Sequence, residues 1–237
     1  MSTSGAKGSY PEEFAALARS FAEAGGVSPT LHQIVAKSLE VVPCDWSAVA
    51  MTDHLSDRPA RMAAVTDAEL MRTVAKISAV RDSPGRTAFR AGSMVHCDDL
   101  TTTTQWCDYA RAMVQETPVR AVLSFGLQLH GDTLGVLTFY SARPGGFDVA
   151  AQRRGRLLAD HATVAIGFAA SADAADSLRD ALNTSRLIGA AIGVLAERHT
   201  ITTDQAFDLL RVVSNNANRR LADVAEDFMR TGELPEP

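Results

Sequence analysis

Cysteine has the widest chemistry of the residue types present, from metal binding to nucleophilic catalysis. The chain has three cysteines, Cys44, Cys97 and Cys107. Their odd number and their spacings fit no zinc pattern, and a reducing compartment would keep them as free thiols. A catalytic thiol also needs a lowered pKa and access to substrate, which a sequence does not display. We therefore expect structural cysteines.

Polar and aromatic residues gather around two of these cysteines. The group contains His96, Cys97, Asp98, Asp99, Trp106 and Cys107. The chain has no evident Ser/His/Asp triad, phosphate-binding glycine loop or paired metal-ligand motif. Because pockets are few per protein, such a group more often consists of ordinary loop and core residues. The sequence predicts no catalytic residue and no metal site.

The cations of the chain are almost all arginines. Lys7, Lys37 and Lys76 are the only lysines among 23 basic residues, and the formal net charge is −5. Arginine contacts phosphates and base edges better than lysine does, although a coding bias explains the excess equally well. The negative charge argues against a globally basic nucleic-acid binder, so any such binding must be local.

Length and composition indicate two parts without a membrane span. The chain has 237 residues, of which 46% are hydrophobic, enough for one medium domain and a small appendage. No 18 apolar residues run together, and the N-terminus MSTSGAKGSY lacks the pattern of a secretory signal. We expect a cytoplasmic protein in which residues 1–9 are disordered.

Apolar periodicity predicts mixed α and β structure over the first 150 residues. We expect helices over 12–24, 28–42 and 67–80, and strands over 46–52, 61–65, 121–129 and 133–140. The last two strands, joined by Gly131 and Asp132, give the clearest hairpin. The Ser-Pro-Gly sequence at 83–85 ends a helix, and we expect a long irregular region after it.

The proline-free segment from Val149 to about His199 is expected to form one long helix. Its four glycines each cost about 1 kcal/mol relative to alanine, so a packing partner must hold it. Residues at alternating four- and three-residue steps form a heptad seam, namely Leu157, His161, Val164, Phe168, Ser171, Ala175, Leu178, Leu182 and Ser185.

Two partners are open for this helix. We favour a dimeric coiled coil with 151–180 as the linking helix. The residues expected to dimerise are Leu157, Val164, Phe168, Ala175, Leu178 and Leu182. The alternative is packing on the globular domain through an alanine row, formed by Ala162, Ala165, Ala169 and Ala172. Periodicity alone does not separate the two.

Two short helices complete a C-terminal module over 181–237. Thr202 and Gln205 form a capping box at the start of the first helix, which ends near Asn216. The second is expected from about Asn218 to Arg230 and stops at Gly232. Together with the end of the long helix they make a three-helix module.

The residue order of this module is specific. It consists of Arg186, Ile188, Gly189, Ala191, Gly193, Ala206, Phe207, Leu210, Arg211, Ser214, Asn218, Leu221, Val224 and Ala225. Residues 182–235 thereby closely resemble the ANTAR family of RNA-binding antitermination domains. The resemblance implies dimers that bind paired RNA hairpins, block terminator formation and let transcription continue. Ala196, where the family usually has methionine, is a departure that we interpret as a packing change.

A module of this kind must neutralise phosphates and hold unpaired loop bases. The residues assigned to RNA binding on this ground are Arg186, Gly189, Ala190, Gly193, Arg211, Asn215, Asn218, Arg219 and Arg220. Arginines supply charge, asparagines supply amides for base edges, and the small residues leave the first helix smooth.

The charge of the module opposes this assignment. From residue 180 onward there are 6 basic and 9 acidic residues, a net charge of −3. The acidic residues are therefore expected to lie away from the arginines, and these are Asp204, Asp208, Asp223, Glu226 and Asp227.

The upstream part has a second resemblance. Residues 85–100 and 119–148, with the order of elements over about 10–170, resemble a GAF domain. This implies an α+β fold with an antiparallel sheet flanked by helices, and we assign 10–150 as a GAF-like sensory or dimerisation domain. GAF domains commonly bind small molecules over the sheet. The ligand stays unidentified here, and no cofactor is predicted.

The sequence thus predicts a dimeric RNA-binding regulator of transcription and signal transduction, not an enzyme. One alternative is a GAF-fold thiol reductase of the free methionine sulfoxide type, acting through Cys97 and Cys107. Others are a helix-turn-helix DNA-binding regulator, weakened by the acidic residues and the lack of lysine, and a protein-interaction adaptor.

Overall fold

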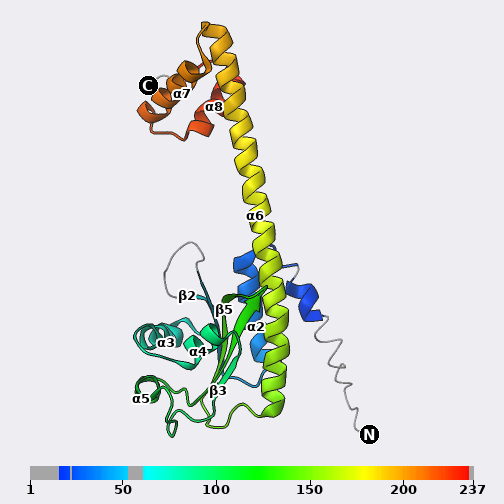
Figure 1. Cartoon of the computed structure of the whole chain (residues 1–237), viewed down its shortest axis with the longest axis vertical. Coiled ribbons are helices and arrows are strands. Elements are labelled where there is room, and N and C mark those ends of the chain that lie inside the picture. The colour runs from blue at the N-terminus through cyan, green and yellow to red at the C-terminus, as the bar shows by residue number, and fades with distance from the viewer. Residues whose placement is uncertain (1–15, 22, 53–60, 235–237) are drawn as a thin grey trace. The chain divides into compact units, whose positions relative to one another are not determined.

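The computed structural model describes residues 16–21, 23–52 and 61–234. They belong to two compact units, Met1–Ala172 and Asp173–Pro237. Figure 1 shows the elements in chain order. The expected disorder of residues 1–9 and the expected helix start at residue 12 lie outside the described residues. Within the described ranges, no helix combines the length and apolarity that a membrane crossing needs.

A five-stranded antiparallel sheet forms the centre of the first unit, in the order β2-β1-β5-β4-β3. The strands are β1 Trp46–Met51, β2 Arg61–Val65, β3 Met94–Cys97, β4 Ala121–Leu129 and β5 Asp132–Ser141. The expected β4–β5 hairpin is confirmed, with Leu129 paired to Asp132. The two turn residues are His130 and Gly131, with φ of 53° and 96° as a type I′ turn requires, so Asp132, expected in the turn, is instead the first residue of β5.

Helices cover both faces of this sheet, which confirms the α+β class (Figure 1). One face packs against α2 (Val27–Val41) and the first part of α6 (Val149–His199), in a core that includes Ile34, Phe139 and Leu158. The other face packs against α3 (Ala68–Val80) and α5 (Cys107–Glu116), in a core that includes Val74, Met113 and Tyr140. Successive strand residues alternate between these two cores, because side chains in a strand point to opposite faces.

The segment expected to be irregular is ordered, so that prediction was wrong. It holds α4 (Pro84–Ala91), β3 and α5. The Ser83 hydroxyl accepts a hydrogen bond from the Arg86 amide at 3.3 Å, and Pro84 is the first residue of α4. The Ser-Pro pair therefore begins a helix as well as ending one, because serine caps a helix and proline fits its first position.

The long helix is confirmed over Val149–His199. Its first half packs on the sheet through three residues of the alanine row, with Ala162 and Ala169 buried and Ala165 against the same core, whereas Ala172, expected in the row, is exposed. A Cβ atom at Gly155 would lie 2.8 Å from the Phe125 ring. Glycine therefore permits the close approach of helix and sheet there, and the packing offsets its cost in helix stability.

The seam residues of α6 are exposed, except for the half-buried His161. Between 42% and 67% of each large side chain is accessible, for Leu157, Val164, Phe168, Leu178 and Leu182. Ala175 is exposed too, as is every other residue from 171 to 186. The alanine row and the seam thus lie on different faces, and packing on the domain leaves the seam accessible.

The second unit is a three-helix module. It consists of the end of α6, α7 (Thr203–Asn216) and α8 (Leu221–Thr231). Both hydrogen bonds of the expected capping box between Thr202 and Gln205 are present. The core contains Ala191, Leu195, Ala206, Leu210, Val224, Ala225 and Phe228. The last helix starts at Leu221 rather than at Asn218, because Asn218 has a left-handed backbone, φ 50°.

Candidate nucleic-acid interface

The turn between α7 and α8 holds most of the residues assigned to RNA binding. The amides of Asn218 and Arg219 donate to the carbonyls of Asn215 and Ser214 at 3.1 and 3.0 Å, which closes α7 around the left-handed Asn218. The Ser214 hydroxyl donates to the Arg219 carbonyl at 2.5 Å. Backbone bonds therefore fix the turn, and the Asn218 side chain is exposed.

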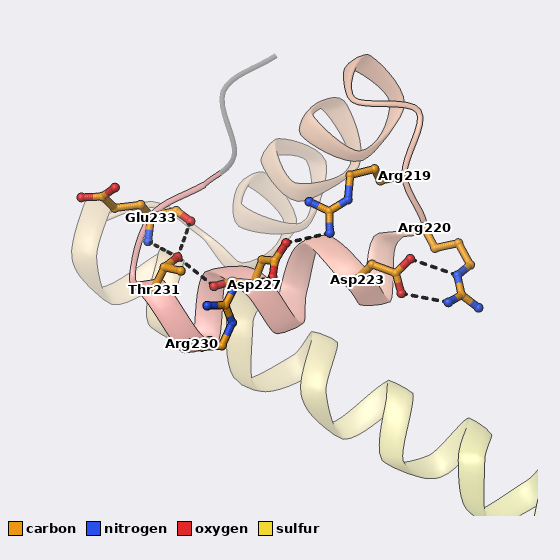
Figure 2. A network of polar contacts seen from close by, with 7 residues as sticks. All are labelled: Arg219, Arg220, Asp223, Asp227, Arg230, Thr231 and Glu233. Carbon is orange, nitrogen blue, oxygen red and sulfur yellow. Dashed lines mark hydrogen bonds and ion pairs between the residues drawn. The ribbon is translucent and has the colours of Figure 1, made fainter.

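Carboxylates of α8 hold the arginines of this turn (Figure 2). Asp227 accepts from Arg219 at 2.7 Å and from Arg230 at 2.9 Å. Arg220 pairs with Asp223 at 3.1 Å. Hydrogen bonds from Arg230 and Arg219 hold the pKa of Asp227 below its ordinary value. Figure 2 shows Arg219, from the turn before α8, and Arg230, from the last turn of α8, beside Asp227.

One turn before the end of α7, Arg211 pairs with Asp208 at 2.9 Å. The expectation that acidic residues lie away from the arginines was therefore wrong for Asp208, Asp223 and Asp227. For Asp208 and Asp223 the cause is local spacing, since residues three apart on a helix are neighbours on its surface. The Arg219–Asp227 pair instead spans eight residues and depends on the path of the turn. Exposed ion pairs of this kind are worth about 0–1 kcal/mol, so a phosphate can replace the carboxylate at small cost.

The remaining assigned residues lie on the last turns of α6. Arg186, Gly189, Ala190 and Gly193 are all exposed. A Cβ atom at Gly189 or Gly193 would meet nothing within 4 Å. Within the part of the chain that the structure describes, Arg186 has no carboxylate partner, unlike the arginines of the turn. This face is smooth and has an available guanidinium group.

The assigned residues thus form two groups, both on the surface. Asn215, Asn218, Arg219 and Arg220 lie at the α7–α8 turn with Arg211 one turn before, and the others lie on α6. Among the described residues, no hydrogen bond or ion pair joins the two groups. The residues at the α7–α8 turn lie close together because backbone hydrogen bonds close that turn.

A positioning residue was missed in the sequence. An Arg198 Nη1–H group donates to the carbonyl of Gly232. Gly232 is the residue that ends α8, with a left-handed φ of 75°. This bond ties the last turn of α6 to the end of α8. The available signal was a basic residue in the last turn of a helix, where it can bond free carbonyls, but nothing in the sequence names the partner.

Two members of the polar group around the cysteines make local hydrogen bonds in the first unit. Asp99 accepts from the Thr101 amide at 2.8 Å, and the Trp106 indole N–H donates to Thr87 at 3.0 Å. Burial lowers the pKa of His96, against the opposing effect of Asp98. Among the described residues, no three His, Cys, Asp or Glu side chains gather as a metal site.

Two of the three thiols have a raised pKa. Burial raises the pKa of Cys97, and burial together with the nearby Asp45 raises the pKa of Cys44 to about 12. The exposed Cys107 donates a hydrogen bond to the Thr104 carbonyl at 3.1 Å. Because the thiolate is the nucleophile, a raised pKa opposes the thiol-reductase alternative.

Solved structures share the fold of the first unit. The GAF domain of the cyanobacteriochrome TePixJ is 18% identical with a TM-score of 0.53, covering 63% of this chain and 94% of that one. The GAF domain of an Acinetobacter phosphoenolpyruvate-protein phosphotransferase is 11% identical (TM-score 0.53; 71% and 99% covered). A free methionine-R-sulfoxide reductase from Neisseria meningitidis, solved with its substrate, is 15% identical (TM-score 0.54; 72% and 98% covered).

These identities support the fold alone. No curated protein matches the chain. Two family models do match, the GAF domain over residues 29–167 and the ANTAR domain over residues 176–229. The GAF match spans more than half of the chain, and the ANTAR match covers the helices that carry the exposed arginines. The chain therefore belongs to the GAF domain family and carries a C-terminal ANTAR domain.

Proposed function

We propose that this protein is a cytoplasmic transcription antitermination regulator that, as a dimer, binds paired hairpins in nascent RNA and prevents terminator formation. The GAF and ANTAR domains together imply an RNA-binding antitermination regulator. The observation that carries the proposal further is that every residue assigned to RNA binding from the sequence is exposed on the module.

The α7–α8 turn and the face of α6 would share the work of binding. Arg211, Arg219 and Arg220 would exchange their carboxylate partners for RNA phosphates, since charge-assisted bonds to phosphate are strong and bidentate. Asn215 and Asn218 would contact base edges in the hairpin loop. On α6, Arg186 needs no exchange, and the glycines let RNA backbone approach the helix.

The exposed seam of α6 supports the dimer. Large apolar side chains at heptad spacing are accessible along a helix whose residues 171–186 are all exposed. A second copy of the same helix would bury them, as in a two-stranded coiled coil. We propose that the GAF domain acts as the sensor or dimerisation unit, with 151–180 linking it to the RNA-binding module over 181–237.

The experiment is a gel shift of RNA carrying two short hairpins, with the full chain. We expect Arg186→Ala and Arg219→Ala each to weaken binding, and the slope of log K against log salt to fall by about one for each lost phosphate contact. The matched control is Arg111→Ala, which removes an exposed arginine with an i,i+3 carboxylate partner, Asp108, from the GAF domain. Unchanged binding by both module variants would refute the site.

Two competing functions are tested in the same preparation. Duplex DNA that displaced the RNA hairpins would favour a helix-turn-helix regulator. Reduction of free methionine sulfoxide that disappeared in a Cys97→Ser, Cys107→Ser double variant would favour the reductase, which the raised pKa of Cys97 opposes.

A further inference from the structure

The C-terminal module contains two aromatic residues with opposite environments. Phe228 is 2% exposed at the centre of the module core. Phe207 is 39% exposed and belongs neither to that core nor to the partly buried residues packed against it. Single exposed apolar residues are common on protein surfaces, so the neighbours of Phe207 decide what its exposure means.

Phe207 begins a row of exposed side chains along α7. Arg211 and Asn215 follow it at steps of four residues, and both are exposed. Residues four apart lie one above the other on a helix, so the row presents a ring, a guanidinium group and an amide in succession. It ends beside the α7–α8 turn, where Asn218 and Arg219 lie.

These three groups are the ones that hold unpaired nucleotides. Loop bases splayed out of a hairpin stack on aromatic rings or guanidinium planes, and amides bond their edges. Stacking on a side chain is worth a substantial part of single-strand affinity and tolerates any base, because every base has a π-face. The row therefore fits one unpaired base with its flanking backbone.

The charges around the Phe207 ring favour a neutral base as its binding partner over a phosphate or an apolar protein surface. Asp204 and Asp208 lie three residues before and one residue after Phe207 on the same helix, and both are exposed. Carboxylates repel a phosphate, and their burial in an apolar protein interface is costly. A neutral base stacked on the ring avoids both costs, while Arg211 beyond Asp208 remains within reach of the next phosphate.

We propose that Phe207 is the stacking platform for an unpaired base of the bound RNA hairpin loop, with Arg211 and Asn215 holding the adjoining backbone and base edge. The inference rests on the proposed function, because it needs a hairpin RNA as ligand. It adds an apolar contact to a site otherwise made of charges and amides.

The test compares Phe207→Leu with Phe207→Tyr in the full chain. The probe is a two-hairpin RNA selected on the wild-type protein from a library with randomised loops. Leucine keeps an apolar side chain and removes the π-face, so we expect binding to weaken about tenfold to 100-fold, whereas tyrosine retains it. The salt slope should stay unchanged in Phe207→Leu, because no phosphate contact is lost.

Controls keep the result specific. Val212→Ala removes another exposed apolar side chain of α7, 51% accessible and outside the row, and should bind like the wild type. Thermal unfolding of Phe207→Leu should match the wild type, because the ring is outside the core. If the wild type selects no RNA, the proposed function fails. If it binds RNA and Phe207→Leu binds equally, or if Phe207→Leu changes only the sedimentation coefficient, the stacking proposal is overturned.

Discussion

The arginines of the α7–α8 turn and of α7 are held by carboxylates in the free protein. Arg219 and Arg230 share Asp227, and Arg211 and Arg220 have aspartates of their own. These pairs hold the guanidinium groups near the turn while reducing its positive potential. If RNA binds at this turn as proposed, phosphate must compete with carboxylate for the arginines, and both interactions weaken as the salt concentration rises.

Removal of a competing carboxylate should strengthen RNA binding. In Asp208→Asn, Arg211 loses its 2.9 Å partner, and we expect the affinity to rise by up to about fivefold, the effect of an exposed ion pair. The measurement is Kd at low and at high salt, where the gain should shrink. Asp108→Asn, which frees Arg111 in the GAF domain, is the control and should leave Kd unchanged. Weaker binding by Asp208→Asn would contradict the competition.

Asn218 has a left-handed backbone and, in the proposed function, an amide that contacts RNA, and substitution can separate the two. Glycine accepts its left-handed backbone without strain, whereas alanine costs about 1 kcal/mol or more there. We expect Asn218→Gly to keep the thermal stability of the wild type and to lose RNA affinity, because the amide is gone. Asn218→Ala should lose both. Full RNA affinity in Asn218→Gly would assign the residue to the turn alone.

Asp227 makes the stability of the module depend on pH. Its pKa lies below the ordinary 3.8 in the folded protein, because Arg230 and Arg219 bond the carboxylate. The stabilisation is therefore present above the ordinary pKa and disappears as pH falls through the folded value. We expect Asp227→Asn to unfold at a lower temperature than the wild type at neutral pH, with the difference closing under acid conditions. If the difference in unfolding temperature grew on acidification, the stabilising role assigned to the Asp227 carboxylate would be contradicted.

Residue types were easier to predict from the sequence than their partners. The i,i+3 pairs of Arg211 and Arg220 follow from helical spacing once the helices are known. The pair of Arg219 with Asp227 spans eight residues across the start of α8, and Arg198 reaches Gly232 from another helix. Such contacts depend on how the helices pack, which periodicity does not determine.

Among the elements, the strongest local signals gave the correct structures. The Thr202–Gln205 capping box correctly predicted the start of α7. The turn at Gly131 correctly predicted where β4 and β5 join. The segment with α4, β3 and α5 was missed because these elements are short and their apolar positions few. Ser83 and Pro84 are a helix start signal as well as a stop, because serine caps the first turn of α4 and proline fits its first position.

Two glycines of α6 lie in different surroundings, Gly155 against the sheet and Gly189 in open space. Gly155 packs against Phe125, so Gly155→Ala should destabilise the GAF domain by about 1–3 kcal/mol through overpacking. Gly189 faces open space, so Gly189→Ala should raise helix stability by about 0.5–1 kcal/mol and weaken RNA binding at the smooth face. Thermal unfolding and RNA titration of the two variants check both signs. Stabilisation by Gly155→Ala would contradict the close packing.

For the whole molecule, the structure confirms one of the two packing partners expected for the long helix, the GAF domain, and the pairing of two copies stays a prediction. Three residues of the alanine row pack on the GAF domain, and the seam stays exposed, so packing on the domain and pairing of two copies are compatible. The seam was visible as periodicity, but the pattern could not show which face the domain would cover.

Disruption of the seam should separate the copies. A glutamate at Phe168 or Leu178 would place like charges opposite each other in the paired helices, so we expect Phe168→Glu and Leu178→Glu to sediment as monomers and to bind two-hairpin RNA more weakly. Ser177→Glu adds the same charge at an exposed position outside the seam and should remain dimeric. Dimers that persisted in both seam variants would place the interface elsewhere.

The central claim is that this chain binds paired hairpins in nascent RNA, and the most direct measurement is sequencing of the RNA that co-purifies with the full chain from its own cell. We expect enrichment of transcripts with two adjacent hairpins that overlap a terminator, and loss of that enrichment in an Arg186→Ala, Arg219→Ala double variant. RNA recovered equally by the wild type and the double variant, or without paired hairpins, would contradict it.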